Sequence, residues 1–500
     1  MAQIQVNHLT FYYEGSYEEI FNDVSFAVDT DWKLGFTGRN GRGKTTFLNL
    51  LMGKYEYRGT ILAPVEFEYF PFPVEDKTRL TLELVEEMHP DCELWRLMRE
   101  LNLMEMDPEV LYRSFDTLSN GEQTRVMLAV LFLKEHSFLL IDEPTNHLDM
   151  DARQAVSRYL NKKTGFILVS HDRVFMDGCI DHILSLNRNT IEVVQGNFSS
   201  WWENKKQRDE SEAQENLKLK KEIGRLKEAA KQAERWSDDV EKTKKGTRIA
   251  GLRPDRGHIG HKAAKMMKRS KNAEHRMENA ASEKEKLLKD VETAERLKII
   301  PLRHHKQVLV TMEDVSLGYP KGVKPVCEHL SLEIREGDRA VLDGRNGSGK
   351  STVIKAILEC NDAPDVLSGR IETASGLIIS YVAQDTSWLT GSIGDFTEKY
   401  GLDDTLFRAI LRKLDFSRTH FEKEMQYYSE GQKKKVLLAK SLCEQAHLYI
   451  WDEPLNFIDV FSRMQIEDLI MSYGLTMIFV EHDRAFTEKV ATKRISLYNT

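Results

Sequence analysis

The sequence predicts an α/β fold in which two similar domains stand in tandem, joined by a long α-helical hairpin. Four short motifs occur twice in the same order, and short apolar runs alternate with amphipathic stretches in both halves. The segment between the halves is rich in Lys, Glu, Ala, Gln and Arg. Such alternation is typical of a largely parallel sheet flanked by helices. We expect domains at 1–198 and 301–500, with the helical linker at 199–300.

The repeated motifs lie 306 to 311 residues apart. They are GRNGRGKT at 38–45 and GRNGSGKS at 344–351, SNGEQ at 119–123 and SEGQ at 429–432, DEP at 142–144 and 452–454, and SHDR at 170–173 and EHDR at 481–484. Four motifs that repeat at nearly one offset indicate a duplicated domain.

Both Gly-rich loops match the phosphate-binding pattern G-x-x-x-x-G-K-[ST], between an apolar strand and a helix-like stretch. Their backbone N–H groups are expected to bind phosphates at a helix N-terminus, with Lys44 and Lys350 at the β and γ oxygens. The hydroxyls of Thr45 and Ser351 are expected to bind Mg²⁺. The nucleotide-binding residues predicted from the two loops are Gly38, Asn40, Gly41, Gly43, Lys44, Thr45, Thr46, Gly344, Asn346, Gly347, Gly349, Lys350, Ser351 and Thr352.

Two apolar strands, one in each half, end in an Asp-Glu pair. Asp142 and Asp452 are predicted Mg²⁺ ligands, while Glu143 and Glu453 are predicted to polarise the attacking water. Acids that cap a helix before a proline are the alternative for either pair taken alone. The phosphate-binding loop upstream of each pair favours the catalytic interpretation.

His171 and His482 each follow a further apolar strand and are predicted to donate a hydrogen bond to the γ-phosphate. The Gly-rich loops (Walker A), the Asp-Glu pairs (Walker B), LSNGEQ at 118–123 (the signature), NHLD at 146–149 (the D-loop) and these switch histidines together resemble the ABC ATPase superfamily. The short signature separates that superfamily from other P-loop proteins.

The resemblance implies that the two cassettes pair head to tail within one monomeric chain and bind two ATP molecules with Mg²⁺. The implied pairings are Lys44, Glu143 and His171 with Ser429 and Gly431 at the first site, and Lys350, Glu453 and His482 with Ser119 and Gly121 at the second. Adenine is expected to stack on Tyr13 and Tyr319.

The linker has two runs with helical spacing of apolar residues, and Gly246, Gly251, Pro254, Gly257 and Gly260 cluster between them. This pattern predicts two long antiparallel helices with a turn at about 243–262. Residues 242–271 carry eleven Lys and Arg against one acid, which leaves −18 for the rest of a chain whose net charge is −8.

Such a basic turn is either a solvated spacer or a polyanion contact, and the concentration of charge favours nucleic acid. The predicted RNA-binding residues are Lys244, Lys245, Arg248, Arg253, Arg256, Lys262, Lys265, Lys268 and Arg269.

Two cassettes joined by a charged helical hairpin resemble the ABC-F family of translation factors and ribosome-protection proteins over essentially the whole chain. GRNGRGKTT at 38–46 and WDEPLNFIDV at 451–460 are most similar to Lsa-type resistance proteins and their Vga and OptrA relatives. The resemblance implies binding to the bacterial 70S ribosome through its exit site, near 23S rRNA and the P-site tRNA. It also implies protection from drugs at the peptidyl transferase centre, with lincosamides, pleuromutilins and streptogramin A expected.

Three positions depart from the family pattern. Gln384 occupies the expected metal-binding glutamine position of the second half, whereas Phe72 stands at the matching place in the first. Phe457 stands in the second D-loop where the first has His147, and Tyr428 begins the second signature in place of leucine. The two sites are therefore expected to be unequal.

Other function classes remain open at this point: a general factor that rescues stalled ribosomes, the ATPase subunit of a membrane exporter, or a DNA-repair ATPase. An exporter subunit does not explain the basic hairpin, and repair ATPases insert their coiled coil inside a cassette. The chain has no apolar run of membrane-spanning length and five scattered cysteines. A cytoplasmic protein without a membrane partner is expected.

Overall fold

The computed structural model describes residues 2–14, 19–134, 136–146, 148–187, 190–243, 301–319, 325–345, 347–359 and 363–497, with Lys265, Lys268, Asn272 and Arg276 besides. It divides into two compact units, residues 1–201 with 295–500 and residues 202–294. The first unit holds both nucleotide-binding domains, here called the first and second cassettes. Each shows the largely parallel sheet that the sequence predicts.

The main sheet of the first cassette has the strand order β5-β6-β7-β3-β8-β9. Its strands are β3 (Lys33–Thr37), β5 (Glu66–Phe70), β6 (Ser137–Asp142), β7 (Phe166–Val169), β8 (His182–Asn187) and β9 (Thr190–Gln195). All neighbours pair in parallel except β8 and β9. Strands β3, β6 and β7 are almost wholly buried, as expected for parallel strands covered on both faces. Their carboxyl ends carry Walker A, Walker B and the switch histidine.

A second, antiparallel sheet covers the Walker A helix. It has the order β2-β1-β4, formed by β1 (Gln3–Phe11), β2 (Phe21–Asp29) and β4 (Arg58–Leu62). Apolar residues of β1 and β2 form one core with α1 (Lys44–Leu51) and the main sheet. This core fixes the base of the Gly-rich loop, because α1 begins at its lysine.

The remaining elements of the first cassette are helical. They are α2 (Thr81–Met88), α3 (Leu94–Leu103), η1 (Pro108–Tyr112), η2 (Phe115–Thr117), α4 (Asn120–Leu131), α5 (Met150–Asn161) and α6 (Arg173–Asp177). Helix α4 begins with the signature, where Ser119 and Glu122 form a capping box. Helix α5 follows the D-loop and α6 follows the switch histidine, so each motif lies at a helix N-terminus.

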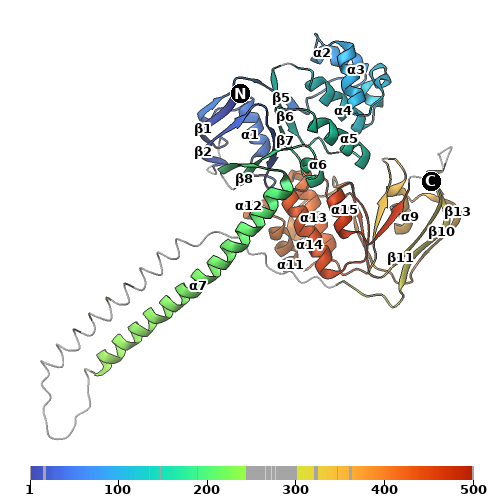
Figure 1. The fold of residues 1–500 in the computed structure, drawn as a ribbon. Helices are drawn as coiled ribbons and strands as arrows, with labels where there is room; N and C mark the ends of the chain where they lie inside the picture. Colours follow the sequence, from blue (N-terminus) through green and yellow to red (C-terminus); the bar gives the residue numbers. More distant parts are fainter. Residues whose placement is uncertain are drawn as a thin grey trace, which may run out of the picture. The chain divides into compact units, whose positions relative to one another are not determined.

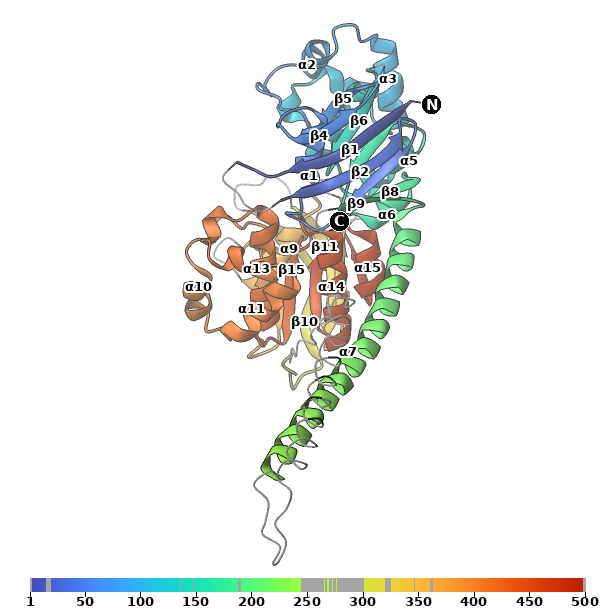
Figure 2. The same ribbon diagram turned by 90° about the vertical axis from the view of Figure 1, so that its left-hand side faces the viewer.

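The second cassette repeats this plan, with a main sheet β14-β15-β16-β12-β17 and an antiparallel sheet β11-β10-β13. Its strands are β10 (Val308–Gly318), β11 (Cys327–Arg335), β12 (Arg339–Asp343), β13 (Asp365–Thr373), β14 (Ile379–Val382), β15 (Leu448–Asp452), β16 (Met477–Val480) and β17 (Lys493–Ser496). Its helices are α9 (Lys350–Leu358), α10 (Ile393–Lys399), α11 (Asp404–Lys413), α12 (Arg418–Phe421), η3 (Met425–Tyr427), α13 (Glu430–Cys443), α14 (Val460–Tyr473) and α15 (Arg484–Val490). Helices α14 and α15 lie side by side (Figure 2). They follow the second D-loop and the second switch histidine.

Helix α7 (Phe198–Thr243) is one continuous helix of 46 residues (Figure 1), about 69 Å long at 1.5 Å per residue. Its first turn belongs to the first unit, where Trp201 is buried and contacts Phe461 edge to face, with ring centroids 6.3 Å apart. This confirms the first helix of the predicted linker. None of the described helices combines the length and apolarity that crossing a bilayer requires.

Most of the predicted turn lies outside the described residues. This applies to Lys244, Lys245, Arg248, Arg253, Arg256, Lys262 and Arg269. Lys265 and Lys268 are described as exposed helical positions. RNA contact by all nine residues stays a prediction.

Candidate ATP sites

The two Gly-rich loops adopt a backbone that depends on glycine immediately before the lysine. Gly43 has φ 103° and Gly349 has φ 90°, in the left-handed region. A Cβ on Gly43 would also lie 2.5 Å from Cγ2 of Ile20. Glycine is therefore required on conformational and steric grounds at Gly43 and on conformational grounds at Gly349, and each loop leads directly into α1 or α9.

Both loop lysines are buried with the ammonium turned into the loop. Lys44 Nζ donates to the Gly38 carbonyl at 2.7 Å, and Lys350 Nζ donates to the Gly344 carbonyl at 2.7 Å. Burial lowers the pKa of both lysines, against nearby carboxylates that raise it. Among the described residues, the hydrogen-bond partners of both ammonium groups are carbonyl oxygens. A buried cation in such surroundings suits an anionic ligand, because phosphate oxygens would compensate its charge.

The Walker A hydroxyl of the first cassette lies against the Walker B aspartate. Thr45 Oγ1 donates to Asp142 Oδ2 at 2.9 Å, and the Tyr69 hydroxyl donates to the same oxygen at 3.0 Å. Burial raises the pKa of Asp142 above its usual value, and it likewise raises the pKa of Asp452. Ser351 is a hydrogen-bond partner of Asp452, so the pair recurs in the second cassette.

The two Walker B glutamates have the same unusual backbone conformation. Glu143 has φ 52° and Glu453 has φ 47°, a region that non-glycine residues seldom occupy. Each N–H is held by the neighbouring strand, at the carbonyls of Val169 and Val480 respectively. This backbone conformation is a form of strain that clusters at active sites.

In the first site, Glu143 lies close to the switch histidine. Glu143 Oε1 is 3.1 Å from His171 Nε2, although the two atoms are not aligned for a hydrogen bond. Burial, together with Asp142, raises the pKa of Glu143 to about 8. Burial, with the charges of Lys44 and Arg463, lowers the pKa of His171 well below its usual value.

In the second site, Glu453 is held by amides. Its Oε2 accepts hydrogen bonds from Gln384 Nε2 at 2.8 Å and from Asn456 Nδ2 at 2.7 Å. His482 is half-buried, and its buried Nε2 has no partner in the described structure. Burial, with Lys350 and Arg153, lowers the pKa of His482 to about 3, so its imidazole is neutral. The two sites therefore differ in what holds the glutamate.

The second signature and D-loop lie against the first Walker A loop. Asn40 Nδ2 donates to the Phe457 carbonyl at 2.9 Å, and a Cβ on Gly431 would come within 3.5 Å of Asn40 Nδ2. Arg39 pairs with Asp415 at 3.1 Å across the same boundary. The structure thus brings the first Walker A loop and Gly431 together. Ser429 is exposed and caps α13.

At the second site, the first signature and D-loop are expected to face Walker A of the second cassette, and fewer described contacts join them. Asp149 of the first D-loop acts electrostatically on both Lys350 and His482, where it offsets part of the lowering of their pKa values by burial. The atom nearest a Cβ on Gly121 belongs to Leu148 of its own cassette, and Ser119 is exposed. The described contacts therefore do not join the first signature to Walker A of the second cassette. Asn346, predicted for this site, lies outside the described residues.

The aromatic residues predicted to stack on adenine are partly exposed. The Tyr13 hydroxyl lies 2.8 Å from Thr46 Oγ1, and its ring makes edge contacts with Phe11 and Tyr55. Tyr319 occupies the corresponding strand end of the second cassette. Adenine stacking on either residue stays a prediction.

The residues present suit ATP with Mg²⁺. Among the described side chains, buried polar atoms without a partner include Glu143 Oε1, Asp452 Oδ1, His482 Nε2 and Ser348 Oγ. Buried polar groups are normally satisfied, so four unsatisfied atoms at the two Walker sites fit a polar ligand that binds there. The candidate metal donors are oxygens of Thr45, Ser351, Asp142, Asp452 and Gln384, the donor type that Mg²⁺ prefers.

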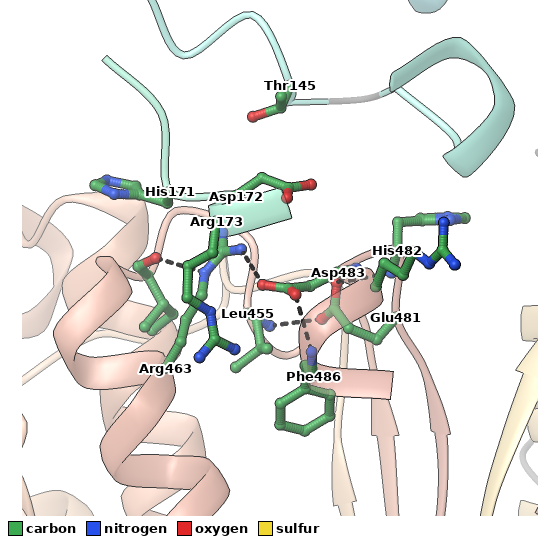
Figure 3. A network of polar contacts seen from close by, with 12 residues as sticks. Thr145, His171, Asp172, Arg173, Leu455, Arg463, Glu481, His482, Asp483 and Phe486 are labelled. Carbon is green, nitrogen blue, oxygen red and sulfur yellow. Dashed lines mark hydrogen bonds and ion pairs between the residues drawn. The ribbon is translucent and has the colours of Figure 1, made fainter. Parts of the chain in front are cut away.

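Sequence reasoning missed several polar residues between the cassettes. Arg153 and Arg463 are both buried, and each pairs with the aspartate that follows a switch histidine, Asp172 or Asp483. Figure 3 shows Arg463 reaching Asp483, with Glu481 beside it. Arg153 and Arg463 are 310 residues apart, the same separation as the two Walker B motifs. This shared offset is the sequence signal that could have identified them as a matched pair.

Comparison with known proteins gives one family model. The model of the ABC transporter family matches residues 21–146 and 327–456, which together make up just over half of the chain.

Individual relatives match almost the whole length. The chain is 27% identical to the ribosome protection protein VmlR of Bacillus subtilis, over 97% of this chain and 85% of VmlR. It is 26% identical to the energy-dependent translational throttle protein EttA of Haemophilus influenzae, over 95% and 88% of the two chains. Among solved structures, the archaeal ribosome recycling factor aABCE1, in complex with the stalk protein aP1, superposes with a TM-score of 0.60. It is 19% identical and covers 98% of this chain and 87% of its own, which supports the fold alone.

Proposed function

Because the chain belongs to the ABC transporter family and, within it, to the ABC-F proteins, we propose that this ATPase binds the bacterial ribosome in its ATP-bound state. The observation that carries the proposal is the architecture: two cassettes in one compact unit, with the long helix α7 leading to a basic segment. Dense positive charge at the end of a helix favours a polyanionic partner. The similarity to VmlR and EttA, both named for roles in translation, also supports a ribosomal partner.

We divide the chain into cassettes at 1–198 and 301–500 and a linker at 199–300, and assign one ATP to each Walker A loop. In each site the lysine and loop N–H groups hold the phosphates, and Mg²⁺, held by Thr45 with Asp142 or by Ser351 with Asp452, would neutralise phosphate charge. The ionised form of Glu143 or Glu453 accepts a proton from water as the water oxygen attacks the γ-phosphorus. The bond from that phosphorus to the bridging oxygen breaks, giving ADP and phosphate.

The first experiment tests nucleotide-gated ribosome binding. The double variant Glu143→Gln with Glu453→Gln should bind ATP and hydrolyse it far more slowly, because an amide cannot accept the proton. The cassettes then stay closed, and the variant should pellet with 70S ribosomes in ATP but not in ADP, while the wild type pellets weakly. Equal pelleting of both proteins in either nucleotide contradicts the proposal.

The finer proposal concerns antibiotics. The protein enters the vacated exit site and places the linker tip (residues 247–258) near the P-site tRNA and 23S rRNA. There it protects the peptidyl transferase centre from lincosamides, pleuromutilins and streptogramin A. ATP hydrolysis releases it. The support is the similarity to VmlR and the Lsa-like motifs around Walker A and the second Walker B. Folded RNA is recognised through shape, phosphates and unstacked bases, so the tip need not touch the drug.

Deletion of residues 247–258 tests this finer proposal. The shortened protein should retain ATPase activity without ribosomes and lose protection in susceptible bacteria. Growth inhibition by the three drug classes is compared at equal expression of both proteins, alongside intracellular drug accumulation. Protection that survives the deletion, or accumulation that falls when the full-length protein is expressed, contradicts ribosome protection and favours efflux.

A general role in rescuing stalled ribosomes is the second candidate, favoured by the similarity to EttA. It predicts that the double glutamine variant inhibits translation in extracts without any drug, and that expression of the wild type leaves drug sensitivity unchanged.

A further inference from the structure

Arg153 connects the two cassettes at the second site. It is buried on α5, one turn past Asp149 of the first D-loop, and its Nε donates to the Leu148 carbonyl at 3.0 Å. Its Nη1 donates to Asp172 Oδ2 at 3.0 Å and to the backbone carbonyl of His482, in the second cassette, at 3.1 Å. The guanidinium is thus anchored on the first cassette while it holds the peptide group of the second switch histidine.

The other side of the same histidine is held from within its own cassette. Glu481 Oε1 accepts the N–H groups of His482 at 2.8 Å and Asp483 at 3.2 Å, and its Oε2 accepts that of Leu455 at 3.2 Å. Figure 3 shows Glu481 between Leu455 and His482. Both peptide groups of His482 are therefore fixed, and the imidazole is the part left to interact, with its buried Nε2 unpartnered.

We propose that Arg153 is a positioning residue of the second ATP site, supplied in trans by the first cassette, which fixes His482 so that its imidazole reaches the terminal phosphate of ATP. This inference rests on the proposed function for the presence of ATP at that site. A hydrogen bond from a charged donor is stronger than a neutral one and is directional. Separation of the cassettes breaks it, so the second site distinguishes ATP from ADP only when the cassettes are paired.

Arg463 of the second cassette corresponds to Arg153, but it does not hold the switch histidine of the first site. Arg463 Nη1 donates to Asp483 Oδ2 at 2.9 Å and its Nε donates to the Ile458 carbonyl at 2.8 Å, which matches the anchoring of Arg153. In the described residues it makes no hydrogen bond to the His171 carbonyl. Arg463 is therefore a matched control, with the same burial and the same kind of carboxylate partner.

The test compares nucleotide preference in proteins with a single binding site. Lys44→Ala removes binding at the first site and Lys350→Ala removes it at the second. In each background, Arg153→Lys and Arg463→Lys are titrated calorimetrically with the non-hydrolysable analogue AMP-PNP and with ADP. In the Lys44→Ala background, Arg153→Lys should lower the preference for AMP-PNP over ADP by about tenfold, as expected for loss of one aligned charged hydrogen bond. Arg463→Lys should leave it within about twofold.

Asp172→Asn provides a second variant if Arg153→Lys fails to fold. Asparagine still caps α6 at this position, but it removes the charged anchor of Arg153, so the preference should fall in the same direction. The proposal is overturned if Arg153→Lys changes the preference equally in both backgrounds, which marks a structural role, or in neither. Failure of the Lys44→Ala protein to bind either nucleotide instead contradicts the assignment of two ATP sites, and this inference with it.

Discussion

Asn40 donates a 2.9 Å hydrogen bond to the backbone carbonyl of Phe457, so the first Walker A loop holds the main chain of the opposite D-loop. Phe457 has φ 63°, where bulky residues are uncommon. The contact explains why phenylalanine is compatible with pairing at a position where the first D-loop has His147.

Asn40→Ala should weaken pairing at the first site, because the Phe457 carbonyl loses its donor. A net hydrogen bond contributes about 1 kcal/mol, which corresponds to about a fivefold rise in the KM for ATP. Phe457→Asn keeps the carbonyl and suits the left-handed conformation better, so its KM should stay within about twofold. Steady-state ATPase assays in the Lys350→Ala background measure both. A similar rise in both variants contradicts this account.

The sequence predicted the motif-bearing ends of the parallel strands because each motif follows a buried apolar run and its chemistry is local. It did not predict the antiparallel sheets. Strand β1 alternates buried and exposed residues, but its partner β4 follows only at Arg58, beyond the Walker A helix. The Arg153–His482 contact joins positions 329 residues apart and runs through a backbone carbonyl, which side-chain patterns do not reveal.

The unequal glutamine positions should give unequal demands for Mg²⁺. Gln384 contacts Glu453 at the second Walker B, whereas the side chain of Phe72 has no amide oxygen that could bind Mg²⁺. In the Lys44→Ala background, Gln384→Phe should raise the Mg²⁺ concentration for half-maximal ATPase activity several-fold, roughly 1 kcal/mol for one lost oxygen ligand. In the Lys350→Ala background, Phe72→Gln should lower it. Magnesium titrations check both, and an unchanged midpoint in the two variants contradicts a metal-binding role.

Stability of the first cassette should depend on pH through Glu100. This buried carboxylate accepts hydrogen bonds from the Tyr159 hydroxyl at 2.7 Å and from Lys163 at 2.6 Å. Burial raises its pKa, but the bonds from Lys163 and Tyr159 outweigh burial and hold the pKa below its usual value. Its contribution is therefore present above the unfolded pKa of about 4.3 and is lost as pH falls through the lower folded pKa.

Glu100→Gln should destabilise the protein by about 2 kcal/mol at pH 7, since it leaves Lys163 without a charged partner. The difference from wild type should shrink as pH falls below about 4. Glu105→Gln is the control, because its pair with Arg158 is exposed and contributes less than about 1 kcal/mol. Denaturant unfolding at a series of pH values measures both variants. A difference for Glu100→Gln that grows on acidification contradicts the direction of the pKa shift.

The basic segment should control ribosome affinity through counterion release. Reversal of Lys262, Lys265, Lys268 and Arg269 to Glu removes up to four phosphate contacts, each of which contributes about 0.9 to the slope of log affinity against log salt on double-stranded nucleic acid. Ribosome association should weaken and its salt dependence should flatten, while ATPase activity without ribosomes stays unchanged.

The matched control reverses four exposed lysines of α7, namely Lys218, Lys220, Lys221 and Lys231. That control changes net charge by the same amount outside the basic segment and should keep most of the wild-type salt slope, because only direct phosphate contacts release counterions. Co-sedimentation in the hydrolysis-deficient Glu143→Gln, Glu453→Gln background, from about 50 to 200 mM salt, gives the three slopes. Equal slopes for wild type and the first variant would mean that the basic segment is a solvated face, and an equal flattening in both variants would mean that net charge alone is responsible.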